Sequence, residues 1–302
     1  MRALHPFFSI SICALTLISC GGSVSKDRPD GKLSVFVSIP PQASFVKAIG
    51  GERVVVTSFA GEGQDPHQIS VQPKQMSALA KAHVYFSVGM PFEQLLVEKI
   101  SGQKNAPEIV DTTKGVKLIA FEEGAHGHGD DHAHDHDHGE NDPHIWLAPE
   151  KIKAQAETIA ATLKRIAPEH SAEFDKNLAT FVETLDQLDR SISDQMEPFL
   201  GETFFVYHAA FGYFANAYGL YQEPVETGGQ SPTPKALTKF IDHAKEEGAK
   251  VIFVQPQFDQ RNAETVAKEI GGKVVPLDPL AEDVLGNLKI IADSISTALS
   301  NQ

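Results

Sequence analysis

Cysteine is almost absent from this sequence of 302 residues. The two cysteines, Cys13 and Cys20, both stand within the first 20 positions, so the rest of the chain offers no thiol. A disulfide framework is therefore excluded beyond residue 20, and thiolates are excluded there as metal ligands. Any metal site must be built from His, Asp or Glu side chains.

Positive charge is also scarce. Asp and Glu total 40 against 26 Lys and Arg, which leaves a formal net charge of −14. Nucleic acids and anionic lipids bind proteins through clustered Lys and Arg, so neither is expected as the main partner. The hydrophobic share of 41% and the charged share of 22% are those of a folded globular protein, and the length allows two lobes.

Long hydrophobic runs are missing apart from one near the N-terminus. The run Phe7–Ile18 has the length of a signal-peptide core and is too short to span a membrane comfortably. It leads into Leu-Ile-Ser-Cys20, which resembles the bacterial lipobox, whose cysteine is lipidated. We expect a signal peptide over 1–19, a lipid anchor at Cys20 and a polar, flexible tether over 20–32. A simple secretory signal is the alternative.

Strand and helix patterns alternate over two stretches, 33–168 and 198–302. In the first stretch we expect strands at 33–39, 53–59, 83–88, near Ile109 and at 116–121, and helices at 42–49, 73–82, 92–100 and 149–166. In the second we expect strands at 203–207, 250–254 and 273–276, and helices at 210–218, 234–247, 262–270 and 283–299. This α/β alternation predicts two lobes, each a mostly parallel sheet covered by helices.

A long amphipathic pattern occupies residues 169–197, between the two stretches. Its apolar side chains recur at helical spacing: Phe174, Leu178, Phe181, Leu185 and Leu188. At about 1.5 Å per residue such a helix reaches about 40 Å, the length of a whole domain. We expect one long rigid helix joining the two lobes. A long crossover helix inside a single domain is the alternative.

Residues 122–143 break the alternation, because Gly, Asp and His dominate and almost no apolar residue is present. Neutral imidazole is a good ligand for Zn²⁺, and alternate rings along an extended chain share a side, so neighbouring pairs can chelate. Since each bound metal would have to order an unanchored loop, we expect weak, exchangeable binding. A hydrophilic insertion without a metal role is the alternative. The histidines concerned are His126, His128, His132, His134, His136 and His138.

Four further side chains lie at predicted strand ends or in the connections after them: His67, His144, His208 and Asp278. The first two stand in the motif Asp-Pro-His, where proline stiffens the presentation of the next side chain. His208 follows the first strand of the second half and Asp278 the last, where open β/α sheets gather their ligands. Two candidates from each half predict one shared site in the cleft between the lobes.

In their order along the chain, several segments resemble those of the metal-binding solute-binding proteins of ABC importers (cluster 9, or cluster A-I), most closely the zinc-uptake members. The resemblance extends from Leu33 to the C-terminus. Its segments are Asp65-Pro-His67, Ala82-His-Val-Tyr-Phe86, Asp142-Pro-His-Ile-Trp-Leu147, Val206-Tyr-His-Ala-Ala-Phe-Gly-Tyr-Phe214, Ser231-Pro-Thr-Pro-Lys235, Val254-Gln-Pro-Gln257 and Pro276-Leu-Asp-Pro279.

This resemblance implies a component that captures extracytoplasmic Zn²⁺ with high affinity and delivers it to the importer's permease. It implies that His67, His144 and His208 bind the metal and that Asp278 takes the remaining acidic position, which water fills in some members. The manganese binders of the family tend to have Glu where this chain has His208. Three imidazoles and one carboxylate also suit a tetrahedral Zn²⁺, whereas Mn²⁺ prefers more oxygen ligands.

Three other readings remain open at this point. A receptor for Mn²⁺ or another divalent ion has the same architecture. A zinc hydrolase would need an open coordination position, whereas four protein ligands would close the site, and the chain has no His-Glu-x-x-His helix. We therefore expect no enzyme activity. An added adhesin role is compatible with the sequence. We expect an exported monomer in the periplasm or on the outer face of a bacterial membrane.

Overall fold

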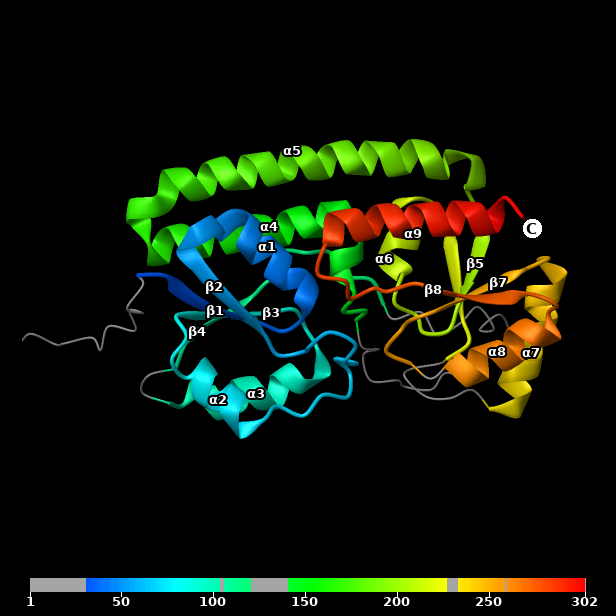
Figure 1. The fold of residues 1–302 in the computed structure, drawn as a ribbon, viewed down its shortest axis with the longest axis horizontal. Coiled ribbons are helices and arrows are strands. Elements are labelled where there is room, and N and C mark those ends of the chain that lie inside the picture. Colours follow the sequence, from blue (N-terminus) through cyan, green and yellow to red (C-terminus); the bar gives the residue numbers. More distant parts are fainter. Residues whose placement is uncertain (1–30, 104–105, 121–140, 227–232, 259, 302) are drawn as a thin grey trace, which may run out of the picture.

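Two separate parallel sheets form the framework of the molecule (Figure 1). The computed structural model describes residues 31–103, 106–120, 141–226, 233–258 and 260–301. In this part of the chain the first sheet has the order β2-β1-β3-β4, with every neighbouring pair parallel. Its strands are β1 (Leu33–Val37), β2 (Val54–Ser58), β3 (Val84–Ser87) and β4 (Glu108–Asp111).

The second sheet repeats this arrangement in the C-terminal half. Its order is β6-β5-β7-β8, again parallel throughout. Its strands are β5 (Thr203–Val206), β6 (Tyr221–Pro224), β7 (Val251–Val254) and β8 (Lys273–Pro276). The expected fold class, two α/β lobes with parallel sheets covered by helices, is confirmed.

Helices cover both sheets, and many begin at a proline. Proline suits the start of a helix because its φ is already helical. It lacks a backbone N–H, but an N–H in the first turn would have no hydrogen-bond partner within the helix. It stands in the first turn of α1 (Pro40–Gly50), α2 (Pro73–Leu79), α3 (Pro91–Ser101), α4 (Pro149–Ile166) and α7 (Pro234–Glu246). The other helices are α5 (Ser171–Met196), α6 (Gly212–Ala217), α8 (Gln260–Glu269) and α9 (Val284–Leu299).

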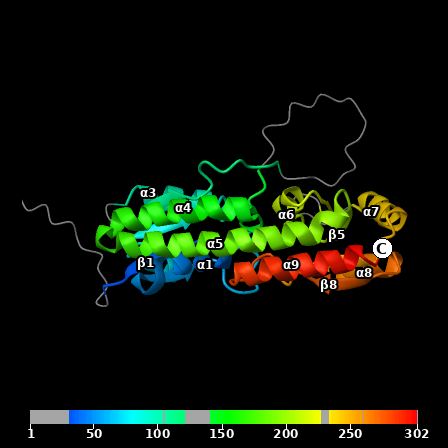
Figure 2. The ribbon, with the colours of Figure 1, turned by 90° about the horizontal axis from the view of Figure 1, so that it is seen from above.

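Helix α5 runs along both halves of the molecule (Figures 1 and 2). Its 26 residues correspond to about 39 Å. It packs on α1 and α4 of the first half and on α9 of the second. The side chains that it buries are Phe174, Phe181, Leu185, Ile192 and Met196. One helix therefore carries a buried apolar stripe shared by the two lobes.

A single core cluster continues from one lobe into the other. It includes Phe45 of α1, Trp146, Phe181 of α5, Phe211 and Leu288 of α9, all buried. Buried apolar contacts of this kind are the main favourable term in folding. They hold the two lobes together, so the loops at their facing edges have defined positions.

Two local expectations differ from the structure. The strand expected at 116–121 is absent from the residues described: Ala120 forms only an isolated antiparallel bridge to Asn141. Conversely, β6 was not expected from the sequence. Its residues Tyr-Gln-Glu-Pro lack the β-branched, alternating pattern of a strand, and an edge strand tolerates proline because one of its sides needs no ladder partner.

Several sequence expectations lie outside the described residues. They are the signal peptide (1–19), Cys20, all but the end of the tether (20–32), and the six histidines between 126 and 138. Among the residues described, no helix has the length and apolar character needed to cross a membrane.

Candidate metal centre

His67 lies in the loop that follows the carboxyl end of β2. The Asp-Pro-His motif folds this loop locally, because Asp65 Oδ1 accepts a hydrogen bond from the His67 backbone N–H at 2.9 Å. Such an Asx turn, together with the fixed φ of Pro66, restrains the backbone that carries the imidazole. The motif thus presents the ring of His67 from a short, stiffened loop.

His144 uses the second copy of this motif, just before the 3₁₀ turn Ile145–Leu147 and helix α4. Asp142 Oδ1 accepts from the His144 backbone N–H at 2.8 Å and also lies 2.6 Å from the ring nitrogen Nδ1. The ring packs beside Trp146, with centroids 5.1 Å apart. Because Asp142 occupies Nδ1, Nε2 is the nitrogen that His144 offers to a metal.

His208 follows the carboxyl end of β5 in the second lobe. Gln255 holds its backbone from both sides, accepting from the N–H at 3.3 Å and donating to the carbonyl at 2.9 Å. Its ring stacks on Phe258 with centroids 5.0 Å apart, and its Nδ1 lies 3.0 Å from Glu226 Oε2. The backbone, the ring face and one ring nitrogen of His208 are therefore all held by neighbours.

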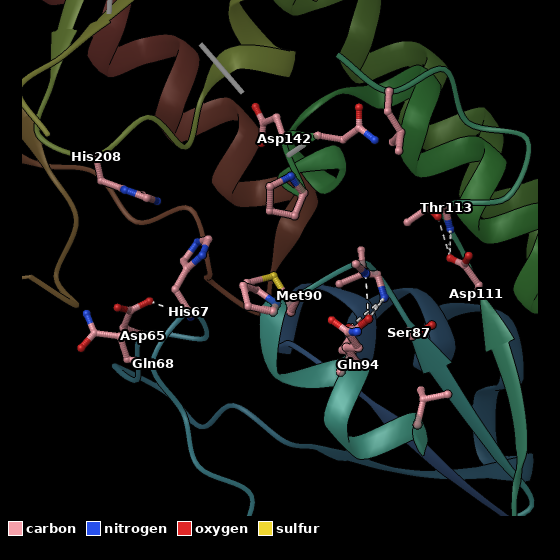
Figure 3. Close-up of a pocket in the computed structure, with 18 of the residues that line it drawn as sticks. Asp65, His67, Gln68, Ser87, Met90, Gln94, Asp111, Thr113, Asp142 and His208 are labelled. Atoms are coloured by element: carbon pink, nitrogen blue, oxygen red, sulfur yellow. Dashed lines mark hydrogen bonds between the residues drawn. The ribbon is translucent and has the colours of Figure 1, made fainter. Parts of the chain in front are cut away.

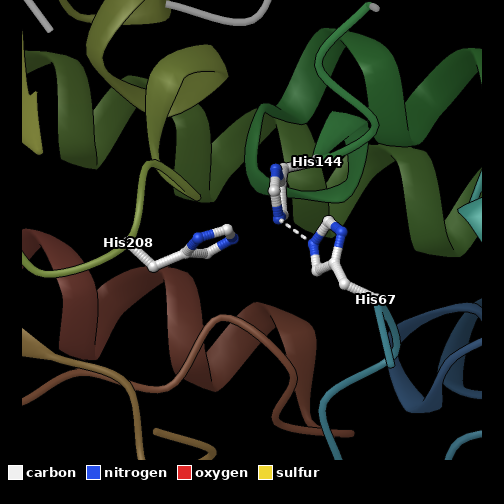
Figure 4. A group of neighbouring side chains, drawn as sticks. All are labelled: His67, His144 and His208. Carbon is white, nitrogen blue, oxygen red and sulfur yellow. Dashed lines mark hydrogen bonds between the residues drawn. The ribbon is translucent and has the colours of Figure 1, made fainter. Parts of the chain in front are cut away.

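The three imidazoles converge between the lobes (Figure 4). One ligand nitrogen from each ring lies within 4.8 Å of the other two, and His67 Nε2 is 3.4 Å from His144 Nε2. Zinc–nitrogen bonds of about 2.0–2.1 Å in a tetrahedral site separate ligand atoms by about 3.3 Å. The nearest pair already has that spacing, so a zinc ion requires only a small closing movement of the third ring.

The electrostatics of the site keep the rings of His67 and His144 neutral. Burial, with the neighbouring His144 and His208, lowers the pKa of His67 to about 3. Burial and the neighbouring His208 also hold the pKa of His144 well below its usual value. Burial raises the pKa of Asp142 to about 7, against the lowering effect of its hydrogen bond from the His144 backbone. Since a metal binds neutral imidazole, the rings need not lose protons at neutral pH.

A large cavity of about 1430 Å³ reaches the site from solvent (Figure 3). His67 and His208 line it at one end, and it continues past Met90 and Gln94 toward Asp111. Its walls near the histidines also contain polar side chains: Asp65, Gln68, Asp142 and Glu226. The arrangement gives a small hydrated ion a polar route to the imidazoles of His67 and His208.

Asp278, the fourth candidate from the sequence, does not join this group. Among the residues that the structure describes, the cluster within 4.8 Å contains the three histidines alone. Asp278 Oδ1 instead accepts hydrogen bonds from Gln257 Nε2 at 2.8 Å and from the Leu280 N–H at 2.9 Å. The six histidines of residues 126–138 lie outside the described part of the chain.

Sequence reasoning missed two side chains of the site, the carboxylates beside His144 and His208. Asp142 carried a readable signal, because it stands two residues before a candidate ligand in a repeated motif. Glu226 carried none, because it follows β6, the strand whose sequence does not read as a strand. Only the pairing of β6 with β5 brings it to His208.

Comparison with known proteins gives a consistent result. The family model described as zinc-uptake complex component A, periplasmic, matches residues 35–298. The high-affinity zinc uptake system protein ZnuA of Brucella abortus is 31% identical over 320 residues, covering 94% of this chain and 93% of its own. A crystal structure of ZnuA superposes with a TM-score of 0.80 at 35% identity, covering 88% of this chain and 99% of its own. A ZnuA deletion mutant with zinc bound gives the same TM-score and identity, covering 90% and 99%.

Proposed function

Because this chain belongs to the family of periplasmic zinc-uptake complex A components, we propose that it binds Zn²⁺ with high affinity outside the cytoplasm and delivers it to the permease of an ABC importer. The observation that carries this function is the convergence of three imidazoles from two lobes within 4.8 Å. Its role is capture and delivery, not catalysis.

The metal ligands in this proposal are His67, His144 and His208, each through one ring nitrogen. Their mutual spacing and the neutral state of His67 and His144 support this assignment. The fourth position of a tetrahedral ion falls to Asp278 or to water. Asp278 is the weaker candidate, because its Oδ1 already accepts hydrogen bonds from Gln257 Nε2 and the Leu280 N–H.

Zinc is favoured over the manganese receptor and over the hydrolase that the sequence left open. Relatives of Brucella abortus and Bacillus subtilis that match over most of this chain are named as zinc uptake proteins. The donor set agrees, because three nitrogen ligands suit Zn²⁺ while Mn²⁺ prefers carboxylate, carbonyl and water oxygens. Competition between Zn²⁺ and Mn²⁺ for the purified protein checks this preference directly.

The N-terminal features supply the rest of the proposal. Lipidation at Cys20, after removal of residues 1–19, would tether a monomer to the outer face of a bacterial membrane near its permease. Streptococcus pneumoniae has a relative named as a zinc-binding lipoprotein, 29% identical over 286 residues and covering 89% of this chain and 54% of its own, which supports an anchor. Mass spectrometry of the mature protein from its native membrane tests the lipid at Cys20.

The histidines at 126–138 would serve as weak, exchangeable zinc sites that raise the local zinc concentration near the cleft. Deletion of 126–138 should remove the weak sites and leave one tight site. A titration that counts bound zinc before and after the deletion measures this. Loss of the tight site would contradict the separation of the two roles.

The direct test of the function is zinc binding by the wild-type protein and by His208→Ala in competition with a chelator. The wild type should hold one zinc tightly. His208→Ala should lose more affinity than the roughly 10–100-fold that loss of an outer-shell partner costs. Asp278→Asn should have the smaller effect.

His243→Ala is the matched control for that test, because His243 lies in the same lobe on α7 and outside the cluster. Its zinc affinity should equal that of the wild type. Equal affinity of His208→Ala and wild type would overturn the assignment of the site.

A further inference from the structure

The pairing of β5 with β6 continues beyond the ends of both strands. Within the strands Val206 stands opposite Pro224. The Val225 N–H then donates to the Val206 carbonyl at 2.9 Å, and the Glu226 N–H donates to the Tyr207 carbonyl at 2.9 Å. The parallel register therefore carries Glu226 to the level of His208, although 18 residues separate them in sequence.

At this place the carboxylate of Glu226 is buried and directed at one ring atom. The side chain is 6% exposed, and its Oε2 lies 3.0 Å from His208 Nδ1. Phe258 stacks on the face of the same ring. Since Nδ1 is taken by the carboxylate, Nε2 is the nitrogen that points toward His67 and His144 (Figure 4).

The segments that carry His67 and His144 contain an aspartate that the segment before His208 lacks. His67 and His144 each have an aspartate two residues before them, and Asp142 reaches both the backbone and the ring of His144. The residue two before His208 is Val206, which cannot do this. Glu226 supplies, from the neighbouring strand, the carboxylate that Asp142 supplies to His144 from within its own loop.

We propose that Glu226 is the positioning residue of the third zinc ligand, holding His208 in the Nδ1–H tautomer with Nε2 turned to the metal. This inference rests on the proposed function, because it assigns a role within the same site. Carboxylates behind metal-binding imidazoles orient the ring and raise its basicity.

The experiment compares wild type, Glu226→Ala and Glu226→Gln with Glu223→Ala as the matched control. Glu223 is a buried glutamate on β6 itself, and its carboxylate lies beside His243, a histidine outside the three-histidine cluster. Chelator competition measures zinc affinity. Long-range ¹H–¹⁵N NMR of the metal-free protein reports the tautomer of His208, a readout that loss of fold stability alone would not change.

Glu226→Ala should weaken zinc binding by roughly 10–100-fold and shift His208 toward the Nε2–H tautomer. Glu226→Gln should keep the Nδ1–H tautomer, because its amide oxygen still accepts from Nδ1, yet bind zinc more weakly than wild type because the charge is gone. Glu223→Ala should leave zinc affinity and the His208 tautomer unchanged.

The outcomes separate the inference from the function. If wild type binds zinc tightly while both Glu226 variants match its affinity and tautomer, the positioning role is wrong and the proposed function stands. If wild type itself fails to bind zinc, the proposed function is wrong. If Glu226→Ala does not fold, Glu226→Gln decides: unchanged zinc affinity in this near-isosteric variant, with His208 in the Nε2–H tautomer, would contradict the positioning role, because tight binding would then not depend on the Nδ1–H tautomer.

Discussion

At the scale of single residues, the surroundings of each imidazole separate the ligand candidates from the other histidines. His170 ends a 3₁₀ turn and His243 lies on α7, and each has a glutamate nearby. The ring of His67 instead faces His144 and His208, with ring centroids 5.4 and 5.1 Å away. A proton on His67 would therefore be placed beside two other imidazoles, which lowers its pKa together with burial.

This arrangement predicts a pH-dependent stability of the metal-free protein. The folded pKa of His67 is about 3, below the ordinary value of 6.5, so on acidification the unfolded chain takes up a proton that the folded protein does not. The free energy of unfolding should therefore fall as pH drops from about 6.5 toward about 3. Glutamine at position 67 does not titrate and so removes this penalty. As the pH falls from about 6.5 toward about 3, the free energy of unfolding of His67→Gln should therefore rise relative to that of the wild type.

Urea unfolding in the presence of a chelator, repeated from pH 7 to pH 4, measures this difference. His243→Gln serves as the control for loss of a histidine elsewhere. If the free energies of unfolding of wild type and His67→Gln differ by the same amount at every pH, the neutral, buried state of His67 is contradicted.

At the scale of elements, the site depends on how closely α6 approaches the loop of His144. Gly212 begins α6, and a Cβ added there would lie 2.9 Å from Asp142 Oδ2 and 2.9 Å from Gln222 Nε2. Real Cβ atoms essentially never come so close to another atom. A glycine at this position therefore lets the second lobe pack directly against the carboxylate behind His144.

Gly212→Ala should displace Asp142, weaken zinc binding and destabilise the protein by about 1–3 kcal/mol, the usual effect of overpacking. Gly102→Ala is the control, since Gly102 has an ordinary negative φ and nothing within 4 Å of its added Cβ. Chelator competition and urea unfolding of both variants check this. Equal zinc affinity of Gly212→Ala and wild type would show that the loop yields without disturbing His144.

The same scale shows which elements the sequence could predict. Helices α4 and α5 were predicted almost residue for residue, because their apolar side chains recur at helical spacing over many turns. Strand β6 and the coil after β4 were not, because both are short and their conformation is decided by neighbours. The residues of β6 carry no strand periodicity, whereas the apolar residues at 116–121 predicted a strand that forms only one isolated bridge in the described part of the chain.

At the scale of the whole molecule, hydrogen bonds between the lobes lie next to the metal cluster. Tyr213 of the second lobe donates to the Asp142 carbonyl at 2.9 Å and accepts from the Ile119 N–H at 3.1 Å. Trp146 Nε1 donates to the Pro279 carbonyl at 2.7 Å. Since the three clustered histidines come from both lobes, any movement that separates the lobes must strain these contacts and draw the imidazoles apart.

Tyr213→Phe should weaken the contact between the two lobes. It leaves the Asp142 carbonyl and the Ile119 N–H without the hydroxyl, which costs about 1–3 kcal/mol. If about 1 kcal/mol of this appears in the barrier to release, zinc should dissociate roughly fivefold faster.

Stopped-flow release of zinc to a fluorescent chelator measures the rate. Tyr221→Phe is the control, because the Tyr221 side chain on β6 is exposed. Dissociation of zinc from Tyr213→Phe at the wild-type rate would contradict the role of this contact in holding the lobes together.

The sequence by itself determined the α/β alternation, the long α5 pattern, the Asp-Pro-His motifs and the histidine positions, because each is a local arrangement of residue types with a local physical consequence. The places of His67, His144 and His208 at strand ends in the two halves also predicted that they share one site. Tertiary structure alone decided that Asp278 is held by Gln257 and Leu280 instead of joining them, and that Glu226 stands behind His208. These facts depend on strand register and lobe packing, which join residues far apart in the chain and therefore leave no mark in any short stretch of it.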